Sequence, residues 1–146
     1  MSIEYAITLC KRAHNYLNSA IRNFKERNYD VSILEAEIAS ELMIKALIIA
    51  LGYEPPRTHE IRQLLSALLN HIKEKKFEDI VNEVEGFIRK FRKELIILED
   101  SRRLGQYCAV SIDYDRAKIT INIVKKILKL IESIWKKVLG SSTWCI

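Results

Sequence analysis

The segment between Asn28 and Leu65 restricts the fold of this chain more than any other part of the sequence. Its first half has small and apolar residues at three- and four-residue steps, the period of one helix face: Ile33, Ala36, Ala39, Met43, Ala46 and Ala50. Asp30 is a candidate cap for this helix, and Gly52 is a candidate for its end. Pro55-Pro56 then bars helix until Thr58, which can cap the next one. The segment therefore predicts a helical hairpin with a stiff connection.

The order of residues in this segment also resembles a known family. The sequence has a Tyr-Asp opening, a small-residue face, Glu41-x-x-x-Lys45-Ala46, Gly52, and Thr58-His59-Glu60-Ile61 followed by Leu64-Leu65. This order resembles the HEPN (higher eukaryotes and prokaryotes nucleotide-binding) domain in its short free-standing archaeal and bacterial form. The resemblance covers most of the chain and implies an all-α bundle. Glu41 and Lys45 lie one turn apart, so we expect an ion pair that fixes helix packing.

Helical periodicity continues through most of the remaining sequence. We expect helices over residues 2–27, 30–51, 58–72, 77–98 and from Asp113 or Asp115 to Gly140. The charged run 73–76 predicts a turn or fraying helix end, and 99–113 an irregular, partly buried connection. The first has the stripe Ala6, Leu9, Ala13, Tyr16, Ala20 and Phe24. Only four Gly and two Pro also favour helices. The prediction is an antiparallel bundle of about five helices.

Length and composition indicate one soluble domain. A chain of 146 residues with 49% hydrophobic and 29% charged residues has the balance of a folded protein. We expect a single domain over 1–146, with 140–146 as a tail. High Ile, Lys, Arg and Glu content with only two Gln favours a thermophile. The resemblance extends this to an archaeal or bacterial source.

Net charge and cysteine content limit the possible partners and the cellular compartment. The net charge of +5 permits an acidic partner such as nucleic acid, or is a set of solvated helix faces. The three cysteines, Cys10, Cys108 and Cys145, include no C-x-x-C pair, so they predict neither a disulfide framework nor a zinc site. No other cluster suggests a metal or cofactor. Charged residues interrupt every candidate membrane span, so we expect a cytoplasmic protein.

The apolar runs Met43-Ile44 and 47–51 exceed the needs of one helical stripe. Two interpretations remain open. Either this helix is central to its own bundle, or part of its surface meets a second chain. The resemblance implies a homodimer, because domains of this family commonly pair through their bundle faces.

The resemblance to the HEPN family implies where catalytic residues would lie. Its RNase members have an Arg, four to six residues, and then a His that helps to move the 2′-hydroxyl proton, while the Arg stabilises phosphate charge. Here Arg102 is followed after four residues by Tyr107, a poor base at neutral pH. Arg102 and Arg103 can still hold phosphate, and Tyr107 can stack on a base or donate its hydroxyl. Alternatively, the two arginines pair with Glu99 or Asp100.

The resulting candidates for nucleotide or RNA binding are Arg102, Arg103, Tyr107, Tyr114 and His59. His59 is also read as a capping and packing residue near a helix start. Further phosphate-contact candidates are basic residues near the end of the predicted fourth helix and along the last helix: Arg89, Lys90, Arg92, Lys93, Lys125, Lys126 and Lys129.

Three functions follow from these observations. The first is a protein that binds nucleotide or single-stranded RNA and that, by resemblance, is the non-catalytic partner of a minimal nucleotidyltransferase in a toxin–antitoxin or defence module. The second is a metal-independent RNase with an atypical site of Arg102, Arg103 and Tyr107. The third is a structural dimerisation module.

Overall fold

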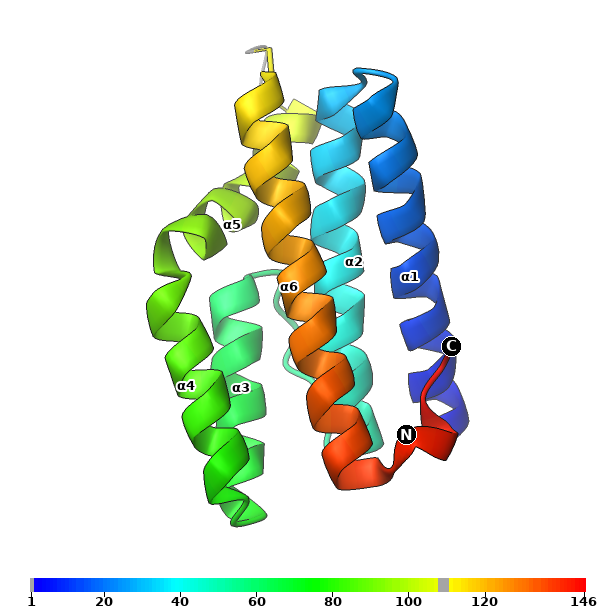
Figure 1. Ribbon diagram of the computed structural model, residues 1–146, viewed down its shortest axis with the longest axis vertical. Helices are drawn as coiled ribbons and strands as arrows, with labels where there is room; N and C mark the ends of the chain where they lie inside the picture. The colour runs from blue at the N-terminus through cyan, green and yellow to red at the C-terminus, as the bar shows by residue number, and fades with distance from the viewer. Residues whose placement is uncertain (1, 108–110) are drawn as a thin grey trace.

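The computed structural model describes residues 2–107 and 111–146. Within them the chain forms six α-helices and one short 3₁₀ helix and no strand: α1 (Ile3–Lys25), α2 (Tyr29–Ala50), α3 (Ile61–Glu74), α4 (Glu78–Lys90), α5 (Arg92–Tyr107), α6 (Tyr114–Leu139) and η1 (Ser141–Thr143). The helices α1, α2 and α6 lie side by side, and α3 and α4 form a hairpin beside them (Figure 1). The predicted all-α bundle is confirmed.

Helix α2 is the centre of the bundle. It contacts α1, α3, α5 and α6, and Met43, Ile44, Leu47 and Ile48 are fully buried within this one chain. The apolar runs that suggested a second chain are therefore covered by helices of the same chain. Of the two interpretations, the structure supports the central helix, and these runs are no longer an argument for a dimer.

Small side chains line the most extensive helix pair, α1 and α2. The fully buried alanines of the two helices are Ala6, Ala13, Ala20, Ala36, Ala39 and Ala46. Ser32 of α2 donates its hydroxyl to the carbonyl of Ala20 at 2.7 Å. The predicted stripe of α1 is wrong at Tyr16, which is 38% exposed, because the buried side chain there is the neighbouring Leu17.

The predicted helix ends are confirmed more often than the predicted starts. Gly52 and Gly140 follow α2 and α6 with positive φ of 95° and 85°, which glycine adopts without strain. Asp113 caps α6 by accepting the amide of Arg116 at 2.9 Å. The prediction for Asp30 is wrong, because Asn28 is the residue at the start of α2. Thr58 accepts the amide of Glu60, but α3 begins only at Ile61.

The predicted fourth helix is divided in two, which raises the number of helices in the described residues to six. The backbone turns at Phe91, between α4 and α5. Helix α5 then continues to Tyr107, so the prediction of an irregular segment from Glu99 is wrong for 99–107. The Cys108–Val110 part of that prediction lies outside the described residues.

The C-terminal segment is attached to α1. A disulfide joins Cys10 of α1 to Cys145, 135 positions later, so the expectation that these cysteines form no disulfide is wrong. The odd number of cysteines and their spacing could not predict this bond, because Cys10 and Cys145 meet only after α6 returns beside α1. Across residues 2–107 and 111–146, every helix lacks the combination of length and apolarity needed to cross a membrane.

Candidate functional site

Two carboxylates of α2 and one arginine of α5 meet inside the bundle. Arg102 Nη1 donates to Glu41 Oε2 at 3.0 Å and lies 3.4 Å from Glu37 Oε2. Glu37 is 1% exposed and Glu41 is 6% exposed, whereas 31% of the Arg102 side chain reaches solvent. The arginine therefore forms the boundary between the buried acids and the surface.

Two further basic side chains converge on Glu41. Lys45 donates its ammonium to Glu41 Oε1 at 2.9 Å, as the one-turn spacing predicted. His59, from the loop before α3, places Nδ1 2.7 Å from the same oxygen and 3.2 Å from Arg102 Nη1. We define Glu37, Glu41, Lys45, His59 and Arg102 as the charged cluster. It joins α2, α5 and the α2–α3 loop.

Burial changes the proton affinity of this cluster. Removal of Glu37 from water, followed by repulsion from Glu41, raises the pKa of Glu37 to about 7. The positive charges of Arg102 and Lys45 oppose this shift but do not cancel it. The carboxyl of Glu37 therefore exchanges its proton near neutral pH, where an ordinary glutamate is fully ionised.

Gly105 allows α5 to approach α2. A Cβ at this position would lie 2.8 Å from the carbonyl oxygen of Asp30, well inside contact distance. Arg102 is three residues earlier on the same helix, so the close approach at Gly105 also brings the guanidinium to Glu37 and Glu41. This glycine serves helix packing rather than helix termination.

The structure brings together two of the five predicted binding residues, His59 and Arg102. Arg103 is exposed on α5. Tyr107 is 79% exposed and five residues after Arg102, which on a helix is about 140° around the axis. Tyr114 packs elsewhere, with its ring 5.3 Å from that of Phe24.

Two expectations for these residues are corrected. The carboxylate partners of Arg102 are Glu37 and Glu41 rather than Glu99, and Glu99 accepts from the Nε and Nη2 of Arg62 at 2.9 and 3.0 Å. His59 precedes α3 rather than lying within its first turn. The residue that the sequence analysis missed is Glu37. An available signal was its spacing of four residues before Glu41 on the most apolar helix.

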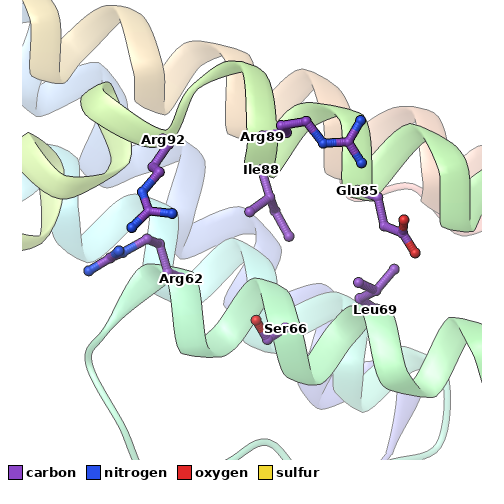
Figure 2. Close-up of a pocket in the computed structure, with 7 residues that line it drawn as sticks. All are labelled: Arg62, Ser66, Leu69, Glu85, Ile88, Arg89 and Arg92. Carbon is purple, nitrogen blue, oxygen red and sulfur yellow. The ribbon is translucent and has the colours of Figure 1, made fainter.

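A basic groove lies between α3 and α4. It has a volume of about 500 Å³ and is lined by Arg62, Ser66, Leu69, Glu85, Ile88, Arg89 and Arg92. Arg62 and Arg92 lie at one end, and Leu69 and Glu85 lie at the other (Figure 2). Arg89 and Arg92 are among the phosphate-contact candidates of the sequence analysis. We call this surface the arginine groove.

The arginine groove adjoins the charged cluster through one ion pair. Arg62 lines the groove and binds Glu99, and Glu99 is one turn before Arg102 on α5. This contact raises the pKa of the Arg62 guanidinium above its usual value, chiefly through the hydrogen bonds to Glu99. Arg89 and Arg92 are exposed and, together with Arg62, which is already paired with Glu99, they favour an anion with several negative charges.

The fold and these surfaces define a compact α-helical protein with a buried acid–arginine cluster beside a basic groove. The family model of the HEPN domain matches residues 6–134. The chain belongs to the HEPN domain family. Membership supports a nucleotide- or RNA-related function in general. Among curated proteins and among solved structures, no significant match was found.

Proposed function

We propose that this HEPN protein binds single-stranded RNA or a nucleotide, with the arginine groove as its phosphate-binding surface. The supporting observation is that Arg62, Arg89 and Arg92 line one groove together with the hydroxyl of Ser66. Guanidinium groups stay charged and present a fork of donors that matches phosphate oxygens. The groove is open along α3 and α4, as binding of a flexible strand requires.

Arg102 has a different role in this proposal. Its guanidinium already neutralises Glu37 and Glu41, so a phosphate would compete with two carboxylates for it. Protonation of Glu37 near pH 7 would reduce that competition. Arg103, Tyr107 and Tyr114 remain candidate contacts outside the groove, and His59 lies in the loop that leads into α3, three residues before Arg62.

Binding is tested with fluorescently labelled single-stranded RNA and with ATP, by anisotropy and calorimetry. The test variant is Arg89→Ala/Arg92→Ala, and the control is Lys11→Ala/Arg12→Ala on α1, which removes the same charge from another surface. We expect at least a tenfold loss of RNA affinity in the test variant. The slope of log K against log salt concentration should become shallower by about 1.4, because the variant removes two phosphate contacts that each contribute about 0.7. Equal losses in both variants would contradict a specific groove.

The partners are proposed from family membership. We propose a cytoplasmic homodimer that acts as the non-catalytic partner of a minimal nucleotidyltransferase, in a toxin–antitoxin or defence module. Light scattering on the purified protein tests the dimer, and co-purification with a nucleotidyltransferase encoded beside it tests the module. A monomer that does not co-purify would leave RNA binding as the whole function. A dimer without RNA or nucleotide affinity would favour the structural module.

One observation favours a second function, a metal-independent RNase. His59 supplies in space the histidine that the Arg102-x₄-Tyr107 motif lacks, since its Nδ1 is 3.2 Å from Arg102 Nη1. An Nδ1–H that donates to Glu41 leaves Nε2 as an acceptor, and 65% of the His59 side chain is exposed. A carboxylate-oriented imidazole of this kind can remove the 2′-hydroxyl proton, while Arg102 stabilises the phosphorane charge.

The two functions are separated by incubating labelled single-stranded RNA with the protein in a chelating buffer. The RNase predicts products with a 2′,3′-cyclic phosphate, lost in His59→Gln and Arg102→Ala but retained in the control His71→Gln. If only Tyr107→Phe lost the cyclic-phosphate products, the result would instead support the Arg102-x₄-Tyr107 motif predicted from the sequence. Binding without cleavage by the wild-type protein would reject the RNase and leave the binding function.

A further inference from the structure

Three side chains that can bind a metal meet where the C-terminal segment packs on α1. Ligand atoms of Cys10, His14 and Cys145 all lie within 4.8 Å of one another. Cys10 is fully buried and Cys145 is 8% exposed. The sulfurs form a disulfide in this structure. His14 Nδ1 is 3.6 Å from Cys145 Sγ.

These three residues can form a tetrahedral zinc site once the disulfide is reduced and the two sulfurs, now bonded to each other, separate to about 3.8 Å, the distance between two sulfurs that bind one zinc. Cys10 and His14 are four residues apart on α1, so both side chains lie on one helix face. Zinc binds sulfur at about 2.3 Å and nitrogen at about 2.0–2.1 Å, which in a tetrahedron separates the two ligand atoms by about 3.6 Å. The observed separation of His14 Nδ1 and Cys145 Sγ is 3.6 Å. Thiolate and imidazole are also the ligands that zinc prefers.

The ligands are held in place without the disulfide. Trp144 makes edge contacts with His14 and with Trp135, each with ring centroids 5.6 Å apart. Trp135 is fully buried and donates its indole N–H to Thr143 at 2.8 Å. These contacts keep Cys145 next to α1 when the disulfide is reduced, so metal binding requires only that the sulfurs separate and the His14 ring turns.

We propose that the reduced protein binds one Zn²⁺ through Cys10, Cys145 and His14, with water as the fourth ligand, and that the disulfide and the metal exclude each other. A dithiol reductant supplies two electrons and two protons to the disulfide and is itself oxidised to a disulfide. Zinc then displaces the two thiol protons. His14 binds as neutral imidazole, with Nδ1 released from its present contact with the Cys10 carbonyl at 3.0 Å. Either state joins the C-terminal segment to α1.

Cobalt replaces zinc as a spectroscopic probe. Protein is reduced, freed of reductant without oxygen, and titrated with Co²⁺. We expect a one-to-one endpoint with a thiolate-to-cobalt charge-transfer band and the strong visible bands of tetrahedral cobalt, both removed by Zn²⁺. The oxidised wild-type protein should show neither band. That comparison needs no substitution and so is independent of folding defects.

Variants identify the ligands. Cys145→Ser and His14→Ala should each weaken Zn²⁺ binding at least tenfold in competition with a chromophoric chelator. Cys108→Ser and His71→Ala are the controls and should leave it unchanged. Absence of the charge-transfer band in reduced, folded wild-type protein would overturn the proposal. Equal metal affinity in the oxidised protein or in Cys145→Ser would overturn it as well.

Discussion

Replacement of Glu37 by Gln should remove a pH-dependent loss of stability that the charged cluster imposes on the fold. The pKa of Glu37 is about 7 in the native protein, against 4.5 for an unperturbed glutamate. The native state therefore binds more protons than the unfolded chain between pH 4.5 and 7. By linkage, the free energy of unfolding falls as the pH rises through this window.

The size of the effect follows from the shift. At about 1.4 kcal/mol per pKa unit, the change from 4.5 to about 7 corresponds to about 3 kcal/mol at pH 8. Glutamine mimics the protonated carboxyl, and its carbonyl oxygen can still accept from Arg102. We therefore expect Glu37→Gln and the wild-type protein to be similarly stable near pH 4.5. The variant should be more stable by up to about 3 kcal/mol at pH 8.

Urea unfolding followed by far-UV circular dichroism at pH 4.5, 6, 7 and 8 measures this difference. Glu132→Gln, on the outer part of α6, shows how much pH dependence follows from removing a carboxylate that pairs at the surface with Lys136. A constant difference between Glu37→Gln and wild type across this range would refute the reasoning. It would mean that Glu37 remains ionised and that Arg102 compensates its burial fully.

Three further predictions concern stability. Gly105→Ala should destabilise the protein by about 1–3 kcal/mol in urea unfolding, because its Cβ would lie 2.8 Å from the Asp30 carbonyl; an unchanged midpoint would show that α5 can shift freely. Cys145→Ser should lower the unfolding free energy of the oxidised protein by about 2–5 kcal/mol, because the disulfide closes a loop of 135 positions; reduction should make variant and wild type alike. Arg62→Ala should cost only about 1 kcal/mol despite its bonds to Glu99, since 40% of the arginine side chain is exposed; a loss above 3 kcal/mol would show a stronger link between α3 and α5.

Local sequence signals predicted the helices because a helix face repeats within one segment. The apolar period marked α2, and Gly52, Asp113 and Gly140 marked ends or starts through their own backbone chemistry. The ends of α1 and α3 have no glycine signal, and Arg27 and Lys76 adopt positive φ there instead. The charged run Lys73-Glu74-Lys75-Lys76 still marked the end of α3 correctly.

The charged cluster was predictable only in part. Glu41 and Lys45 are one turn apart, so helix geometry alone placed them together. The contact of Arg102 with Glu41 joins residues 61 positions apart, and it depends on the packing of α5 against α2 at Gly105. His59 reaches the same carboxylate from a loop. These residues are much farther apart in the sequence than one helical repeat, so helical periodicity could not predict their contacts.

The sequence by itself determined an all-α protein of the HEPN family, because helix periodicity, capping and the order of its motifs are properties of neighbouring residues. Only the tertiary structure decided which charges share a site. It buried Glu37 and raised its pKa, gathered three arginines between α3 and α4, and brought Cys145 to Cys10. Each of these results depends on helices packing against one another at a particular distance, which the energetics of the whole core sets.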